Sequence, residues 1–266
     1  MYAFDYLRPA SVKAATDAAA ASGENKFLAG GMTLLPTLKL RLARPDRLVD
    51  LSGLKELAGI RVERDRVEIG AMTPHADVAA SADIKRALPA LAHLAAGIGD
   101  PLVRNRGTIG GSVANNDPAA DYPAALLGLG ATVITDRREV SADAFFTGMF
   151  STALKPGELI TRVRLPIPKR AAYVKFPNPA SRYAMVGVFV ADFGGSIRVA
   201  VTGAGACVFR LPQFEAALAR NFAPAALDGL SIPSDGLNQD LHGSAEYRAS
   251  LVSVIAHRAV AAALAR

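Results

Sequence analysis

The sequence from residue 98 to residue 126, IGDPLVRNRGTIGGSVANNDPAADYPAAL, is the stretch that decides the fold. Its centre, residues 108–112 (TIGGS), places two glycines between hydroxyl residues, and we name it the second glycine turn. Glycine lets a backbone approach a ligand closely, because it has no side chain. Residues 100–123 are rich in asparagine, aspartate and glycine, so we predict that they form a long loop with a functional role.

A turn of similar build lies upstream, at residues 29–33 (AGGMT), and we name it the first glycine turn. We predict a strand over 26–29 before it and a helix over 33–42 after it, with Thr33 as the N-cap and Pro36 in the first turn. At such a junction, unpaired N–H groups and the helix dipole favour an anion. Each turn alone is weak evidence, but two of them can hold a diphosphate from both sides.

Periodic patterns on either side of these turns predict a first domain over residues 1–168, with subdomains of about 1–55 and 56–168. We expect helices over 11–22, 74–80 and 87–97, strands over 48–51, 61–63, 66–70 and 157–166, and a helix followed by a strand over 125–135. The proline-bounded segment 165–170 is the predicted linker.

A second domain is predicted over residues 169–266. Its strands, over 173–176, 184–193 and 197–202, form a three-stranded antiparallel sheet, and Gly194-Gly195 makes the tight turn between the last two. Helices over 212–220 and 245–265 follow. The segment 203–207 (GAGAC) has Val208 where a dinucleotide fingerprint needs its third glycine, so we expect no Rossmann site there.

The composition limits the class of protein. Of 266 residues, 51% are hydrophobic and 20% are charged, as in a soluble globular protein. No run approaches the roughly 20 apolar residues of a membrane span, and the first residues lack the order of a signal peptide, so we expect a cytoplasmic protein. The net charge of +6 comes from scattered basic residues, which suits a solvated surface, an anionic ligand or an acidic partner, and does not favour nucleic acid.

The sequence offers no metal site. The single cysteine, Cys207, cannot supply the roughly four ligands of a zinc or iron–sulfur centre, so any such centre must sit in a partner. The four histidines, His75, His93, His242 and His257, have no metal-ligand spacing, and we expect surface or capping roles for them. Arg104 and Arg106 flank the second glycine turn, where they can hold phosphate, meet an acidic partner or face solvent.

The chain resembles the FAD-binding (medium) subunits of the xanthine dehydrogenase and aerobic carbon monoxide dehydrogenase family of molybdenum hydroxylases. The resemblance is carried by LAGGMTLLPTLKLRLARPDRLVDLSGL (28–54), VEIGAMTPHADVA (67–79), the stretch 98–126, LKPGELITRVRLPIP (154–168), AYVKF (172–176) and GSAEYRASLVSVIAHRAV (243–260). These stretches run in the family's order and cover nearly the whole chain.

The resemblance implies an α+β fold: a vanillyl-alcohol-oxidase/PCMH-type FAD-binding domain of two subdomains, followed by a small C-terminal α+β domain. It implies non-covalent FAD, bound by Leu28, Ala29, Gly30, Gly31, Met32, Thr33, Thr108, Ile109, Gly110, Gly111, Ser112, Asp121, Ile160 and Lys175. The two turns would bind the pyrophosphate. Lys175 would lie near the flavin ring, where its charge could stabilise the reduced anionic flavin; the alternative is a strand lysine facing water. Ile98 falls at a position that is aromatic in the eukaryotic relatives.

The implied function is electron transfer, with no catalytic residue or metal in this chain. A molybdenum cofactor in a large subunit would oxidise the substrate, and two [2Fe–2S] clusters in a small subunit would pass electrons to the flavin here and on to an external acceptor. A dimer of heterotrimers in the cytoplasm, with membrane association through the complex left open, is the implied assembly. Two alternatives stay open: a self-sufficient flavin oxidase or reductase on the same fold, and a flavin-free scaffold or nucleotide-binding module.

Overall fold

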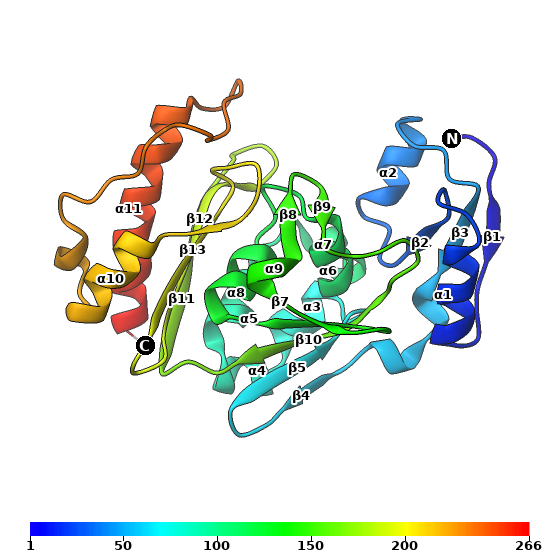
Figure 1. Cartoon of the computed structure of the whole chain (residues 1–266), viewed down its shortest axis with the longest axis horizontal. Coiled ribbons are helices and arrows are strands. Elements are labelled where there is room, and N and C mark those ends of the chain that lie inside the picture. Colours follow the sequence, from blue (N-terminus) through cyan, green and yellow to red (C-terminus); the bar gives the residue numbers. More distant parts are fainter. Residues whose placement is uncertain (266) are drawn as a thin grey trace.

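Three sheets follow one another along the long axis of the molecule, each covered by helices (Figure 1). The structure is a computed structural model and describes residues 1–265. The N-terminal sheet and the C-terminal sheet lie at opposite ends, with the largest sheet and most of the helices between them (Figure 1).

The N-terminal sheet is parallel, with the strand order β1-β3-β2. Its strands are β1 (Asp5–Leu7), β2 (Lys26–Leu28) and β3 (Arg47–Asp50), joined by α1 (Val12–Ala20) and α2 (Leu34–Lys39); short 3-10 helices follow at Leu51–Gly53 and Lys55–Leu57. Parallel neighbours need a crossover connection, and the two helices provide it. Ala15 of α1 packs with Val49 of β3 and with four leucines in a small core of its own.

The central sheet is antiparallel, with the strand order β4-β5-β10-β6-β7. Its strands are β4 (Ile60–Val62), β5 (Arg66–Gly70), β6 (Thr132–Thr135), β7 (Glu139–Ser141) and β10 (Ile160–Pro166). The helices are α3 (His75–Ala80), α4 (Ala82–Ala87), α5 (Pro89–Ala96), α6 (Pro101–Arg106), α7 (Ile109–Asn115), α8 (Tyr122–Leu129) and α9 (Ala142–Phe145), and a two-stranded ribbon pairs β8 (Phe146–Gly148) with β9 (Ser151–Thr152).

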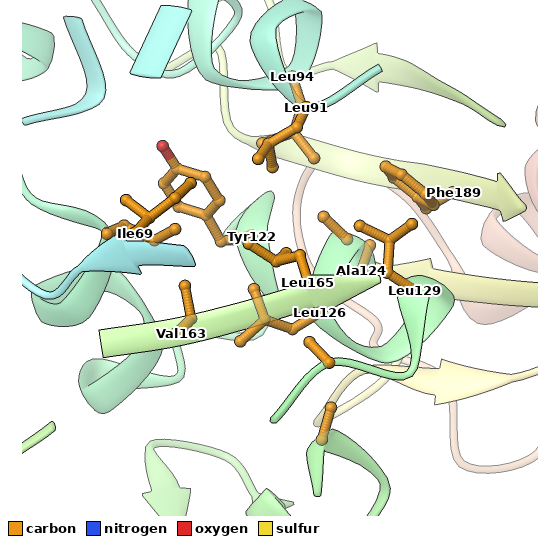
Figure 2. Packing of buried hydrophobic residues seen from close by; sticks show 14 of the residues in the cluster. Ile69, Leu91, Leu94, Tyr122, Ala124, Leu126, Leu129, Val163, Leu165 and Phe189 are labelled. Carbon is orange, nitrogen blue, oxygen red and sulfur yellow. The ribbon is translucent and has the colours of Figure 1, made fainter. Parts of the chain in front are cut away.

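Helix α8 is the centre of the largest core. Every residue of α8 is buried, as expected for a helix that is apolar all round. Figure 2 shows Leu126 and Leu129 of α8 near Val163 and Leu165 of the central sheet and Phe189 of the C-terminal sheet. A Cβ added at Gly128 would lie 2.8 Å from the ring of Phe189, so this glycine permits the close approach of helix and sheet.

The C-terminal sheet is antiparallel, in the order β11 (Arg170–Pro177), β12 (Ala184–Asp192), β13 (Ile197–Thr202) and β14 (Phe209–Arg210). Helices α10 (Pro212–Arg220) and α11 (Ala245–Leu264) cover one face, with a 3-10 helix at Pro224–Leu227, and the other face packs on the central core. All of β12 is buried, because both of its faces are covered.

Most of the expected strands and helices are present, but three expectations were wrong. Residues 100–123 are not a loop: they contain α6 and α7, which begin where the side chains of Asp100 and Thr108 accept hydrogen bonds from Val103 and Gly111 N–H groups. Thr33 makes no capping hydrogen bond, and α2 ends at Lys39, before Arg41 adopts a left-handed backbone. The C-terminal sheet has a fourth strand, β14, too short to show a periodic pattern.

Candidate functional site

A cavity of about 670 Å³ lies between the N-terminal sheet and the helices of the central region, and we name it the main cavity. It is lined by Lys26 and Phe27 of β2, both glycine turns, the starts of α3 and α7, residues 98–100, residues 158–160 and the loop 180–183. The fold therefore brings together the two glycine turns, which are separated by more than 70 residues of sequence.

The two glycine turns are in direct contact. A Cβ added at Gly30 would lie 2.0 Å from the carbonyl oxygen of Arg106, so the first turn packs on the end of α6. A Cβ added at Gly111 would meet only the Thr108 hydroxyl at 3.0 Å and the Ala29 Cβ at 3.6 Å. Gly30 is thus required because a side chain there would collide with protein. Gly111 lines the cavity, and because it has no side chain it leaves space there for a ligand.

The two turns offer different hydrogen-bonding groups. In the second turn, the N–H groups of Ile109, Gly110 and Gly111 donate to Thr73 O, Ala71 O and the Thr108 hydroxyl, at 3.1, 2.8 and 3.1 Å. In the first turn, the N–H groups of residues 30–33 make no hydrogen bond within residues 1–265. Most of the backbone donors free for an anion therefore come from the first turn, although the two sequence motifs look alike.

Asp121 is the centre of a buried network at one end of the cavity. It is only 4% exposed, accepts a hydrogen bond from the Tyr173 hydroxyl, and pairs with Lys175 at 3.0 Å. Lys175 also donates to the carbonyl oxygen of Gly97 at 2.9 Å. Burial raises the pKa of Asp121, and the neighbouring Lys175 ammonium opposes that shift.

This network holds the side chain of Lys175 in place. Lys175 does not line the main cavity, and its side chain is mostly buried, with the ammonium group bonded to Asp121 and Gly97. Tyr173, two residues earlier on β11, was not among the sequence candidates; alternation along a strand places it on the same face as Lys175.

The cavity is lined by eleven of the fourteen residues that the resemblance indicates: Ala29, Gly30, Gly31, Met32, Thr33, Thr108, Gly110, Gly111, Ser112, Asp121 and Ile160. The other three, Leu28, Ile109 and Lys175, are not part of its lining. Ile98 lines the cavity, and Tyr183, in a loop that the sequence did not single out, places an exposed aromatic side chain there. The guanidinium of Arg104 donates to Ile98 O and Gly99 O, so it fixes this part of the wall from outside.

His75 was expected to have a surface or capping role, and it is buried. It is 4% exposed, lines the main cavity, and packs its ring against Tyr122. Of the other histidines, His257 contacts Asp228 and the carbonyl oxygen of Ser253, while His242 is exposed. No local feature of the sequence indicates that His75 is buried, because the preceding Pro74 pairs with Thr108 of the second glycine turn only in the folded chain.

Glu158, another cavity residue, should make the protein sensitive to acid. Its side chain is fully buried and accepts hydrogen bonds from Arg138, Thr135 and the Lys155 N–H group, and these hold its pKa at about 2. Because the pKa of Glu158 is lower in the folded chain, its carboxylate stabilises the fold at every pH above the ordinary pKa of about 4.5. This stabilisation, about 3 kcal/mol at most, is lost as the pH falls toward 2.

We therefore expect Glu158→Gln to lower the free energy of unfolding at pH 7, and to lower it by a much smaller amount at pH 2.5. Urea unfolding of both proteins between pH 7 and pH 2.5 measures this. A difference between wild type and variant that stays constant over this range would contradict the assignment.

Several features of the cavity fit a flavin dinucleotide. The first turn has free N–H groups for a diphosphate, Gly111 leaves room beside it, and Ile98 and Tyr183 offer apolar walls for a ring. No group of three or more potential metal ligands occurs in the part of the chain that the structure describes. Within the same residues, no helix is both long and apolar enough to cross a membrane. The fold and site define a dinucleotide-binding protein.

Comparison with known proteins identifies the family. Residues 2–168 match the family described as "FAD binding domain in molybdopterin dehydrogenase". The nicotine 6-hydroxylase medium subunit of Paenarthrobacter nicotinovorans and the carbon monoxide dehydrogenase medium chain of Hydrogenophaga pseudoflava are each 35% identical, with 99% of this chain and 98% of theirs covered. The reconstituted carbon monoxide dehydrogenase from Oligotropha carboxidovorans superposes with a TM-score of 0.91 at 34% identity, covering 100% of this chain and 99% of that one.

The chain belongs to the FAD-binding domain family of the molybdopterin dehydrogenases. It is a medium-chain, FAD-binding subunit of the kind found in molybdenum hydroxylases, and the expected α+β fold of the PCMH type is confirmed.

Proposed function

We propose that this chain transfers electrons through FAD from the [2Fe–2S] clusters of a small partner subunit to an external acceptor. A molybdenum cofactor in a large partner subunit would oxidise the substrate. The observation that carries the proposal is a dinucleotide cavity whose lining, in residues 1–265, holds no metal cluster. The relatives include medium subunits of enzymes named for nicotine and for carbon monoxide, so the family membership fixes no substrate.

The groups that would hold FAD are those that line the cavity and have no hydrogen-bond partner within the protein. The free N–H groups of residues 30–33 would bind the diphosphate, with the hydroxyls of Thr33 and Ser112 beside them. Ile98 and Tyr183 would enclose the isoalloxazine ring. Bound flavin supplies the redox chemistry, since it exchanges electrons singly or in pairs.

The Asp121–Tyr173–Lys175 network would position the ring end of the cofactor. Lys175 ties Gly97, next to the cavity residue Ile98, to Asp121 at the start of α8, so it fixes two parts of the wall together. This role stands beside the place near the flavin ring that the resemblance implied for Lys175. We also propose residues 1–168 and 169–266 as the two domains, which this network would join.

The proposed assembly is a dimer of heterotrimers in the cytoplasm, near the inner face of the membrane. Relatives named as medium chains and medium subunits support a multi-subunit complex.

Native expression followed by affinity purification of this chain tests the proposed function. We expect two further subunits to copurify, with flavin, iron and molybdenum in the preparation, and dithionite-reduced clusters to reduce the flavin. Purification without an iron–sulfur or molybdenum partner would contradict the proposal. So would oxidation of a small organic substrate by the purified chain alone.

A further inference from the structure

His75 lies beside the second glycine turn in a setting that the turn itself maintains. The backbone N–H of His75 donates to Gly107 O at 2.9 Å, and the backbone N–H of Ile109 donates to Thr73 O. Residues 73–75 and 107–109 therefore run side by side. A Cβ added at Gly107 would lie 2.7 Å from Nε2 of His75. The missing side chain at residue 107 therefore allows Nε2 to lie against the residue before the turn, and both residues line the main cavity.

Two side chains in contact here, His75 and Tyr122, each carry an unpartnered polar atom. Within residues 1–265, four buried side-chain nitrogen or oxygen atoms lack a hydrogen-bond partner: Arg66 Nε, His75 Nδ1, the Tyr122 hydroxyl and Arg248 Nε. The rings of His75 and Tyr122 are in contact, with centroids 5.3 Å apart. Figure 2 shows the Tyr122 hydroxyl pointing away from Val163 and Leu126. Buried polar atoms left unpaired are costly, so such a pair indicates an ordered water or a ligand.

His75 is uncharged at neutral pH. Burial, together with the nearby charge of Arg104, lowers its pKa to about 4. A neutral imidazole has one N–H donor and one acceptor nitrogen, and the partner of one nitrogen decides where the hydrogen resides. A hydrogen bond accepted by Nδ1 would therefore leave the hydrogen on Nε2.

The second glycine turn has few free backbone donors. Its N–H groups at residues 109–111 are already bonded within the protein, so they are not available to a cofactor. A side chain can supply a further hydrogen bond on this side, and His75 presents a ring nitrogen next to Gly107.

We propose that His75 is an FAD-binding residue whose Nε2–H donates to an oxygen of the FAD diphosphate, while its Nδ1 accepts from an ordered water held by the Tyr122 hydroxyl. The proposal rests on the proposed function, because it requires FAD in the main cavity. It explains why a histidine occupies this buried position, and why its two ring nitrogens face different surroundings.

Three substitutions separate this role from a packing role. The amide nitrogen of glutamine can take the place of Nε2, that of asparagine the place of Nδ1, and leucine offers neither. We expect His75→Leu to raise the Kd for FAD about 10- to 100-fold, His75→Asn to do the same, and His75→Gln to stay within about threefold of wild type. The exposed His242→Leu is the control and should bind as wild type.

The measurement is a fluorescence titration of FAD into the flavin-free chain, with a thermal melt of each variant to verify folding. NMR of the ¹⁵N-histidine-labelled wild type provides a second readout, in which FAD-bound His75 should carry its hydrogen on Nε2. If His75→Leu does not fold, the comparison of glutamine with asparagine and the NMR experiment decide.

The proposal is overturned if folded His75→Leu binds FAD as tightly as wild type, if glutamine and asparagine weaken binding equally, or if the hydrogen lies on Nδ1. A wild-type chain that takes up no FAD would instead refute the proposed function. The two failures are therefore distinguishable.

Discussion

A Gly111→Val variant is expected to fold normally and to lose its FAD. A Cβ at residue 111 meets only the Thr108 hydroxyl at 3.0 Å and the Ala29 Cβ at 3.6 Å, so the valine methyl groups would occupy space beside both turns. A diphosphate then cannot approach, and we expect affinity to fall by a factor on the order of 100 or more. The ratio of flavin to protein absorbance after purification, and a fluorescence titration with FAD, measure the loss.

Gly110→Val is the matched control, because the same side chain there meets protein instead of ligand. A Cβ at Gly110 would lie 2.5 to 2.8 Å from the Cβ, carbonyl oxygen and Cα of Ala71. Overpacking of this kind costs roughly 1–3 kcal/mol or more, so this variant should melt earlier even without FAD. A folded Gly111→Val protein that retains wild-type flavin would remove the second turn from the binding site.

A Lys175→Met variant is expected to be the most destabilising change of a single charge. It would leave the Asp121 carboxylate, 4% exposed, with the Tyr173 hydroxyl as its remaining side-chain partner. Removing one member of a buried ion pair typically costs about 3–5 kcal/mol, because the other charge stays buried and uncompensated. Urea unfolding at pH 7 measures the effect.

The pH dependence and a double variant test the cause of this loss. Burial already raises the pKa of Asp121, and removing Lys175 should raise it further, so a protonated Asp121 would reduce the loss as the pH falls from 8 to 5. Asp121→Asn together with Lys175→Met should recover much of the stability, because no buried charge remains. A loss that is independent of pH and additive in the double variant would show that Lys175 acts through packing alone.

Both substitutions act on residues that the sequence indicated, but their surroundings come from the folded chain. The resemblance implied that Lys175 lies near the flavin, and the structure adds that it pairs with Asp121, 54 residues away, and with Gly97. The two glycine turns look alike as motifs, yet the first keeps more of its N–H groups free. Much of the difference arises from Ala71 and Thr73, whose carbonyl oxygens accept from the second turn in the folded chain.

The structure also contains features with no local signal in the sequence. Helices α6 and α7 begin at the capping side chains of Asp100 and Thr108. Their sequence is rich in asparagine and glycine, a composition that predicts a loop and not a helix. His75 is buried because Gly107 has no side chain, a relationship between residues 32 positions apart. Tyr183 reaches the cavity only because the loop after β11 folds back over it.

The sequence by itself determined the family, the α+β fold and the two glycine turns that line the cavity. These follow from local chemistry, since a glycine turn and its flanking elements are encoded in a few consecutive residues. Only the tertiary structure decided which turn keeps more of its backbone N–H groups free, that Lys175 pairs with the buried Asp121, and that a buried histidine lies beside the second turn. Each of these depends on burial and on partners distant in sequence, which folding alone brings together.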